Sequence, residues 1–396
     1  METTPITKAS LLGEILEFAQ KNGAESADAI WLKNTSLTAS CRLGSPEDLQ
    51  RSEGNDFGLR VFIGCQHASV SSSDTSIEAL KELTLQAIRM AKAVPEDPYC
   101  GLADSSLLIS DWPDLDILDQ NQVNPETLLQ TAKIAEDAAL SVKGVTNSQG
   151  GEAGYEHAEA SLATSNGFMG KYQLTRHSIS VSVLAGSGTG MESDYEYSVA
   201  CHLDDLQDAQ KIGLTAGQKS VRRLGSQKAQ SGQIPVIYDP RVSNSLLRHL
   251  SNAISGASIA RGSSFLANSL GQKIFSSAIN IYDDPYRERG LRSRPFDGEG
   301  VGKKITKIIN NGTLTSWLLD SRSARQLQMI STGHASRSTS GAPTPSPTNF
   351  YLEAGSLTPQ SLMADIKNGL YVTDLIGMGV NTITGDYSRG VSGFMI

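Results

Sequence analysis

In the first half of the chain, apolar residues recur every three or four positions in several stretches, which is the spacing of a buried helix face. These stretches predict helices over residues 8–21, 75–95 and 124–142. The third begins with Asn-Pro, a usual helix start, because proline lacks the amide hydrogen that the first turn leaves unbonded. Two further helices are expected over residues 204–224 and 240–255.

Between these helices, apolar and polar residues alternate with the period of two that is typical of half-buried strands. Residues 170–185 follow this pattern, and the Asn166-Gly167 pair before them is a typical hairpin turn. The segments expected to form strands in this half are 29–32, 57–65, 68–71, 159–165, 170–185 and 192–202. The last three are expected to pair as an antiparallel meander.

After a polar stretch at residues 225–232, glycine-punctuated apolar segments predict shorter strands. These segments are 234–238, 274–282, 302–309, 313–319 and 349–352. The segment 331–348, STGHASRSTSGAPTPSPT, is polar and rich in proline, so we expect a mobile loop with His334 in solvent. The fold class is therefore α+β. An N-terminal helix-and-antiparallel-sheet domain is expected over residues 1–225, followed by a β-rich C-terminal domain over residues 226–396.

Composition and charge argue against several classes of protein: nucleic-acid-binding, membrane-spanning and exported proteins. The 396 residues carry a formal net charge of -8, so the chain has no broad cationic field to hold a phosphate backbone, and a nucleic-acid partner is not expected. No apolar run approaches the roughly 18 residues of a membrane span, and the N-terminus lacks the pattern of an export signal. The four cysteines are scattered without a CxxC pair, as in reduced cytosolic proteins. A cytoplasmic protein is expected.

The C-terminal third contains a series of distinctive motifs. FDGEGV at 296–301, LLDSRSAR at 318–325, STG at 331–333 and LIGMGVNTITGDYSRGVSGF at 375–394 occur in this order. GLRVFIG at 58–64 precedes them. Together they closely resemble the TldD/PmbA family, whose members were called modulators of DNA gyrase and are regarded as peptide-processing metallopeptidases. The resemblance covers nearly the whole chain.

The resemblance implies two kinds of subunit that pair with each other. The TldD kind holds zinc through HExxxH on a helix and a later cysteine, whereas the PmbA/TldE kind lacks these ligands. In this chain His249 matches the first histidine, but Leu250 stands in place of the glutamate and Ile254 in place of the second histidine. No cysteine follows Cys201. Because a catalytic zinc needs about three protein ligands, we expect no metal in this chain. His249 is then an imidazole satisfied by hydrogen bonds within a packed helix, with residual metal binding as the alternative.

The GDYSRG segment provides the other candidate residues. Asp386 and Arg389 are charged residues among apolar strand residues, and burying them unpaired would cost free energy. Either they form an ion pair that holds the turn, or they line a peptide channel. Together with Gly385 and Ser388, they are the candidates for contact with substrate or partner.

The resemblance implies a heterodimer with a TldD-like partner that carries the zinc and the chemistry, while this chain helps to admit extended, unstructured peptides. On this reading the chain is a component of a peptidase that is not catalytic by itself. A peptide-binding homodimer without peptidase activity is the alternative, and an independent hydrolase using Asp386 or its neighbours lacks a convergent base. Family members continue beyond the strand in which this chain ends, at residues 392–396, so the C-terminal domain is expected to be truncated.

Overall fold

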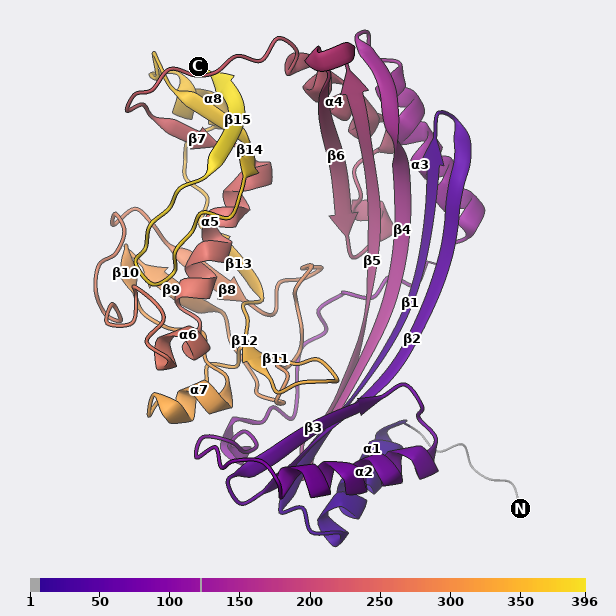
Figure 1. Cartoon of the computed structure of the whole chain (residues 1–396), viewed down its shortest axis with the longest axis vertical. Coiled ribbons are helices and arrows are strands. Elements are labelled where there is room, and N and C mark those ends of the chain that lie inside the picture. Colours follow the sequence, from indigo (N-terminus) through magenta and orange to yellow (C-terminus); the bar gives the residue numbers. More distant parts are fainter. Residues whose placement is uncertain (1–7, 122) are drawn as a thin grey trace.

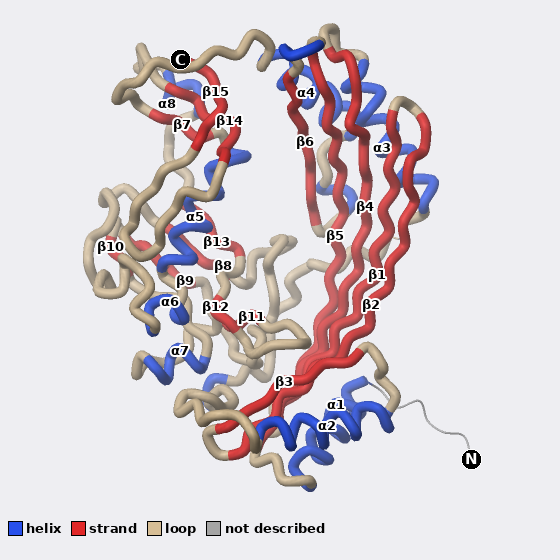
Figure 2. Tube along the Cα trace, viewed as in Figure 1, coloured by secondary structure: helices blue, strands red, loops and turns tan. Residues whose placement is uncertain are grey.

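The computed structural model describes residues 8–121 and 123–396, and its main feature is one long antiparallel sheet (Figures 1 and 2). The strand order is β3-β2-β1-β4-β5-β6. The strands are β1 (Ser26–Arg42), β2 (Ser45–Ile63), β3 (Gln66–Ser72), β4 (Val145–Thr164), β5 (Met169–Ala185) and β6 (Glu192–Ala200). The expected meander of β4, β5 and β6 is confirmed.

Several of these strands are much longer than the apolar alternation predicted. In β2, residues 45–53 are exposed, so this part has no buried face that sequence could reveal. It is extended because its backbone pairs with β1, in a register that sets Trp31 opposite Phe57 and Leu37 opposite Arg51. Ladder hydrogen bonds thus extend the strand beyond the part that side-chain burial specifies.

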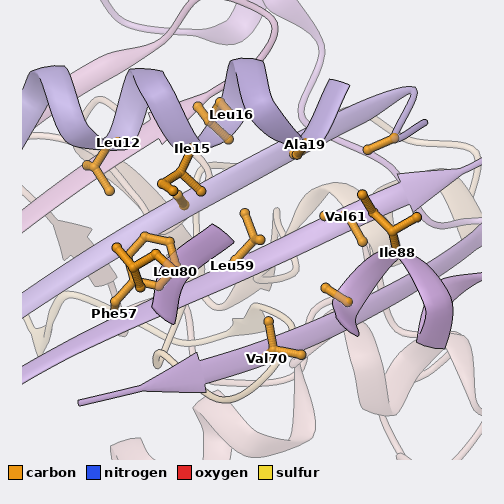
Figure 3. Packing of buried hydrophobic residues seen from close by; sticks show 14 of the residues in the cluster. Leu12, Ile15, Leu16, Ala19, Phe57, Leu59, Val61, Val70, Leu80 and Ile88 are labelled. Atoms are coloured by element: carbon orange, nitrogen blue, oxygen red, sulfur yellow. The ribbon is translucent and has the colours of Figure 1, made fainter. Parts of the chain in front are cut away.

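Two helices cover one end of the sheet. They are α1 (Lys8–Lys21), with the predicted bounds, and α2 (Ile77–Ala91). Figure 3 shows Leu12 and Ile15 of α1 and Leu80 of α2 meeting Phe57 and Leu59 of β2, all of them fully buried. Burying a side chain of this size contributes about 1.5–3 kcal/mol. This cluster is the largest core of the N-terminal part.

The other end of the sheet carries α3 (Pro125–Leu140) and α4 (Ala209–Arg222). Asn124 caps α3, as predicted, by accepting a hydrogen bond from the Thr127 amide at 2.8 Å. The helix expected from residue 204 is a short 3-10 turn, Leu203–Asp205, followed by α4. Gly213 and Gly217 let α4 approach α3 closely, since a Cβ at either position would collide with the α3 backbone.

The C-terminal part contains two small sheets, with orders β10-β9-β8-β13 and β15-β14-β7, and the pair β11-β12. Its strands are β7 (Val236–Tyr238), β8 (Ile281–Asp284), β9 (Thr306–Asn310), β10 (Thr313–Leu314), β11 (Ala335–Ser336), β12 (Thr344–Pro345), β13 (Asn349–Leu352), β14 (Leu370–Ile376) and β15 (Gly390–Met395). Its helices are α5 (Pro240–Ala253), α6 (Gly256–Ala260), α7 (Ser321–Gln326) and α8 (Pro359–Met363). The α+β class is confirmed. The division at residue 225 stays a prediction.

The expectation of a mobile loop at residues 331–348, with His334 in solvent, was wrong. The segment forms the pair β11-β12 and packs into the protein, with His334 fully buried. Arg337 of this segment pairs with Asp28 of β1 at 2.5 Å, and Asp28 also accepts from Arg60 of β2. All three side chains are almost completely buried. A polar segment is ordered here because its charged side chain satisfies a buried carboxylate of the large sheet.

A second contact joins the C-terminal part to the far end of the sheet. Arg241 of α5 pairs with Asp194 of β6 at 2.5 Å and donates to the carbonyl oxygen of Thr373 at 3.0 Å. Both charged side chains are buried. Within the residues that the structure describes, no helix combines the length and the apolar character that crossing a membrane requires.

Candidate functional site

Helix α5 carries the residues that align with the metal motif, and its start is fixed by β7. The two small elements are joined without a loop, because Asp239 caps the helix by accepting from the Arg241 amide at 2.9 Å. The Tyr371 hydroxyl of β14 donates to the same carboxylate at 2.7 Å. β7 pairs with β14 in parallel, and thus α5 is anchored to the sheet that carries the GDYSRG segment.

Leu250 and Ile254 point into the C-terminal core. Their side chains are 9% and 0% exposed and belong to the cluster that includes Leu318. The Ile254 amide bonds back to the Leu250 carbonyl and closes the last turn of α5. The two positions that would supply a carboxylate and an imidazole in the metal motif therefore supply apolar packing here.

His249 lies on a different side of α5, under Tyr387. The two rings meet edge to face, with centroids 5.9 Å apart. The Nε2 atom of His249 is buried and has no hydrogen-bond partner among the described residues, so the expectation of a satisfied imidazole was wrong. Burial lowers the pKa of His249, and the positive charges of Arg248 and Arg389 lower it further. The imidazole is neutral at neutral pH.

The loop between β14 and β15 brings Tyr387 to this place, and Figure 1 shows it descending along α5. The Phe265 amide donates to the Thr382 carbonyl at 2.9 Å, and the Ser388 amide donates to the Gly379 carbonyl at 2.7 Å. Gly385 has φ +82, a conformation that side chains disfavour, and a Cβ there would press on the Phe265 ring. The glycines of the motif thus serve the turn itself.

Asp386 and Arg389 do not form the ion pair that was one of the two expectations. The exposed Asp386 carboxylate accepts from the Thr384 hydroxyl at 2.6 Å. Arg389 donates to the carbonyl oxygens of Leu375 and Ile376, each at 3.3 Å. Its Nη1 atom is buried without a partner in the described part of the chain. Arg389 therefore holds the backbone of β14, while Asp386 and the exposed Ser388 remain open to contact from outside.

Tyr238 lies beside Tyr387, whose ring meets His249. Burial is the main cause that raises the pKa of Tyr238 to about 12, and the hydrogen bond that the Tyr238 hydroxyl makes to Tyr387 is the next. The cluster therefore contains the phenols of Tyr238 and Tyr387, the neutral imidazole of His249 and the Arg389 guanidinium. Across the described ranges, no three His, Cys, Asp or Glu side chains gather closely enough to hold a metal ion. This donor set does not fit zinc, which needs several anionic or imidazole ligands at one point.

A neighbouring face of α5 lines a cleft that sequence reasoning missed. Its volume is about 520 Å³, and three arginines line it: Arg248 of α5, and Arg287 and Arg292 of the segment after β8. Helical spacing could have placed Asn244, Arg248 and Ser251 on one face. Nothing in the local sequence shows that residues 287–292 lie opposite them.

A buried charged cluster was also missed, because His334 was expected in solvent. Lys303 contacts both the Asp283 carboxylate and the Nε2 atom of His334, and the Nδ1 atom of His334 lies 2.7 Å from the Thr332 hydroxyl. Burial lowers the pKa of His334 to about 4, to which the Lys303 charge contributes. Burial also lowers the pKa of Lys303, to about 8. The cluster is enclosed and serves the core.

The candidates from the sequence thus fall into separate environments. His249 and Arg389 share one cluster, whereas Leu250 and Ile254 belong to the core.

Three family models match the chain. They describe domain 1, the central domain and the C-terminal domain of the PmbA/TldA metallopeptidases, over residues 27–91, 118–224 and 231–396. The metalloprotease PmbA of Escherichia coli O157:H7 is 36% identical over 382 residues, which are 96% of this chain and 82% of that protein. The PmbA homolog of Haemophilus influenzae is also 36% identical, over 96% of this chain and 83% of its own length.

Solved structures agree. A putative modulator of DNA gyrase from Bacteroides thetaiotaomicron superposes with a TM-score of 0.90 at 27% identity, covering 99% of this chain and 88% of that one. TldE from Thermococcus kodakarensis, at 20% identity, shares the fold with a TM-score of 0.83 over 93% of this chain and 83% of that one. By these matches, the chain belongs to the PmbA/TldD family.

Proposed function

We propose that this chain is a PmbA/TldE-like subunit of a TldD/TldE-type metallopeptidase, and that a TldD-like partner supplies the zinc and activates the water. The observation that carries the proposal is the packing of α5. Leu250 and Ile254 occupy the two motif positions with buried apolar side chains, and among the described residues no group of three His, Cys, Asp or Glu side chains that could hold a metal includes His249. A zinc ion that activates water needs about three protein ligands and an open position.

In this proposal the substrates are unstructured peptides that bind in extended form. Such peptides can add to an exposed strand edge through main-chain hydrogen bonds, which makes recognition largely independent of sequence. The edge strands of the large sheet are β3 and β6. The relative named TldD homolog, from Buchnera aphidicola, is the kind of partner that the proposal requires. We place the complex in the cytoplasm, since the four cysteines are free.

The test mixes the purified chain with a purified TldD-like subunit and follows cleavage of an unstructured peptide. We expect neither activity nor stoichiometric zinc in this chain alone, and cleavage that a chelator abolishes when the partner is present. Tightly bound zinc at one ion per chain, or chelator-insensitive cleavage by this chain alone, would refute the proposal. Peptide binding by a homodimer of this chain, with no effect on a TldD-like subunit, would favour the non-catalytic homodimer instead.

A further inference from the structure

The arginine cleft beside α5 has a strong local imbalance of charge. Arg248, Arg287 and Arg292 all line it, and no carboxylate does. Within residues 8–121 and 123–396, none of the three forms a salt bridge, although most arginines elsewhere in the chain have acidic partners. The whole chain carries a net charge of -8. The cleft therefore has a local positive charge, from three guanidiniums without salt bridges to the described residues, in a chain whose net charge is negative.

The positions of the three side chains are set by different contacts. Arg292 donates to the Ser346 hydroxyl at 3.0 Å and to the Pro347 carbonyl at 2.9 Å. The Arg287 guanidinium lies over the Tyr351 ring, 5.5 Å from its centroid. These neutral contacts hold the side chains in place and leave their positive charges uncompensated. Arg248 is exposed on α5 and has no hydrogen-bond partner of its side chain within the described part of the chain.

Asp283, the acidic group that acts on Arg292, is already engaged. The buried Asp283 carboxylate contacts Lys303 and accepts from the Thr348 amide at 2.7 Å. Burial lowers the pKa of Arg292, and the adjacent charge of Arg294 lowers it further, against the opposing effect of Asp283. Positive charges behind the cleft, those of Arg294 and Arg176, therefore act on Arg292, and an anion placed in the cleft would offset them.

The rest of the lining fits a peptide better than a polyphosphate. Leu247 and Phe350 offer apolar contacts, and Asn244 and Asn252 can bond main-chain groups. The volume of about 520 Å³ is within the usual range of ligand pockets, about 300–1,000 Å³. Guanidiniums bind carboxylates with two parallel hydrogen bonds, which gives orientation as well as attraction.

We propose that this cleft binds the carboxylate side chains of acidic peptide segments, with Arg248 as the open contact and with Arg287 and Arg292 completing the positive wall. The inference rests on the proposed peptide-handling function and deepens it. Peptides would be selected for Asp or Glu at the position that reaches α5, while the remaining contacts tolerate many sequences.

The test is fluorescence anisotropy of the full chain with two labelled unstructured peptides that differ only in three glutamates replaced by glutamines. We expect the glutamate peptide to bind more tightly. Arg248→Gln should weaken its binding about tenfold, the effect of losing one charge-assisted contact at a partly exposed site. Arg248→Lys should lose less, since the charge remains while the two-pronged geometry is lost. The matched control is Arg51→Gln, an exposed arginine of β2 that pairs with Glu53. It should leave binding unchanged.

Equal affinity of the wild-type chain for the two peptides, or equal binding by the wild-type and Arg248→Gln chains, would overturn the cleft assignment while leaving the proposed function standing. Failure to bind either peptide, alone or with a TldD-like partner, would count against the proposed function itself. Inorganic phosphate is the competing anion. Displacement of the glutamate peptide by low millimolar phosphate would assign the cleft to small anions in general, and the peptide inference would fall.

Discussion

The buried His334 should make the protein sensitive to mild acid. Its Nε2 atom accepts from the Lys303 ammonium and its Nδ1 atom bonds Thr332. A second ring proton would be desolvated in the core and would face the Lys303 charge, and the Asp283 carboxylate, 3.5 Å from Nε2, offsets this cost only in part. The pKa of His334 is about 4 in the fold and about 6.5 in an unfolded chain. Between these values the unfolded chain binds the extra proton, so the free energy of unfolding falls as pH falls.

The size of this effect follows from the two values. At about 1.4 kcal/mol per pH unit, the gap between about 6.5 and about 4 corresponds to about 3 kcal/mol, lost progressively from pH 6.5 down to pH 4. That is a large fraction of the 5–15 kcal/mol that is typical for a folded protein. Replacing His334 by glutamine removes the titrating group, so the variant should lose less stability over this range.

The assay is urea unfolding at several pH values between 7.5 and 4.5, followed by tryptophan fluorescence, to which Trp317 of the C-terminal core contributes. Carboxylates also titrate in acid, and comparison with the variant cancels their common contribution. His157→Gln, at a partly exposed position of β4, is the control and should behave like the wild-type chain. Parallel loss of stability in the wild-type and His334→Gln chains would refute the reasoning, since it would mean that the folded protein accepts the proton without cost.

Two further predictions concern the contact between the large sheet and the C-terminal part. Asp28→Asn leaves two buried guanidiniums short of their carboxylate and should lower the free energy of unfolding by about 3–5 kcal/mol, against about 0–1 kcal/mol for Glu53→Gln in an exposed pair. Both are measured by urea unfolding, and equal effects would contradict the proposed importance of the contact. Gly58→Ala places a methyl group against the Thr339 backbone and should cost about 1–3 kcal/mol, whereas Gly54→Ala on the same strand has room; thermal unfolding of the two variants compares them.

The helices and the antiparallel sheet were predictable because the apolar residues on the buried face of each element recur with its characteristic spacing. The apolar spacing of α1 and the Asn-Pro start of α3 gave their positions closely. The exposed length of β2 was not predictable, because its outer residues are polar on both faces and depend on pairing with β1. Local sequence indicates which residues are buried. The full length of a strand such as β2 can be predicted only when its pairing with a distant segment is known.

The order of residues 331–348 was missed for a related reason. A segment of serines, prolines and glycines has no apolar pattern, yet Arg337 pairs with Asp28, more than 300 positions earlier in the chain. The same limit applies to the cleft. Arg248 and Arg292 lie on separate elements, and their shared environment follows from the tertiary fold. In contrast, the match to the metal motif located α5 correctly. The motif lies within one continuous helix, so it can be recognised from local sequence even though two of its ligand positions are substituted.

The side chains on three faces of α5 show that the substitutions at the motif positions do more than remove metal ligands. One face packs Leu250 and Ile254 into the core, one places His249 under Tyr387, and one carries Arg248 to the cleft. A glutamate at position 250 or a histidine at position 254 would enter an apolar cluster, where burying a charged group without a partner is costly. The packing of positions 250 and 254 and the small number of possible ligands therefore both argue against a zinc site on this helix. We therefore propose that helix α5 is stable without a metal and that its exposed faces contact peptide or partner.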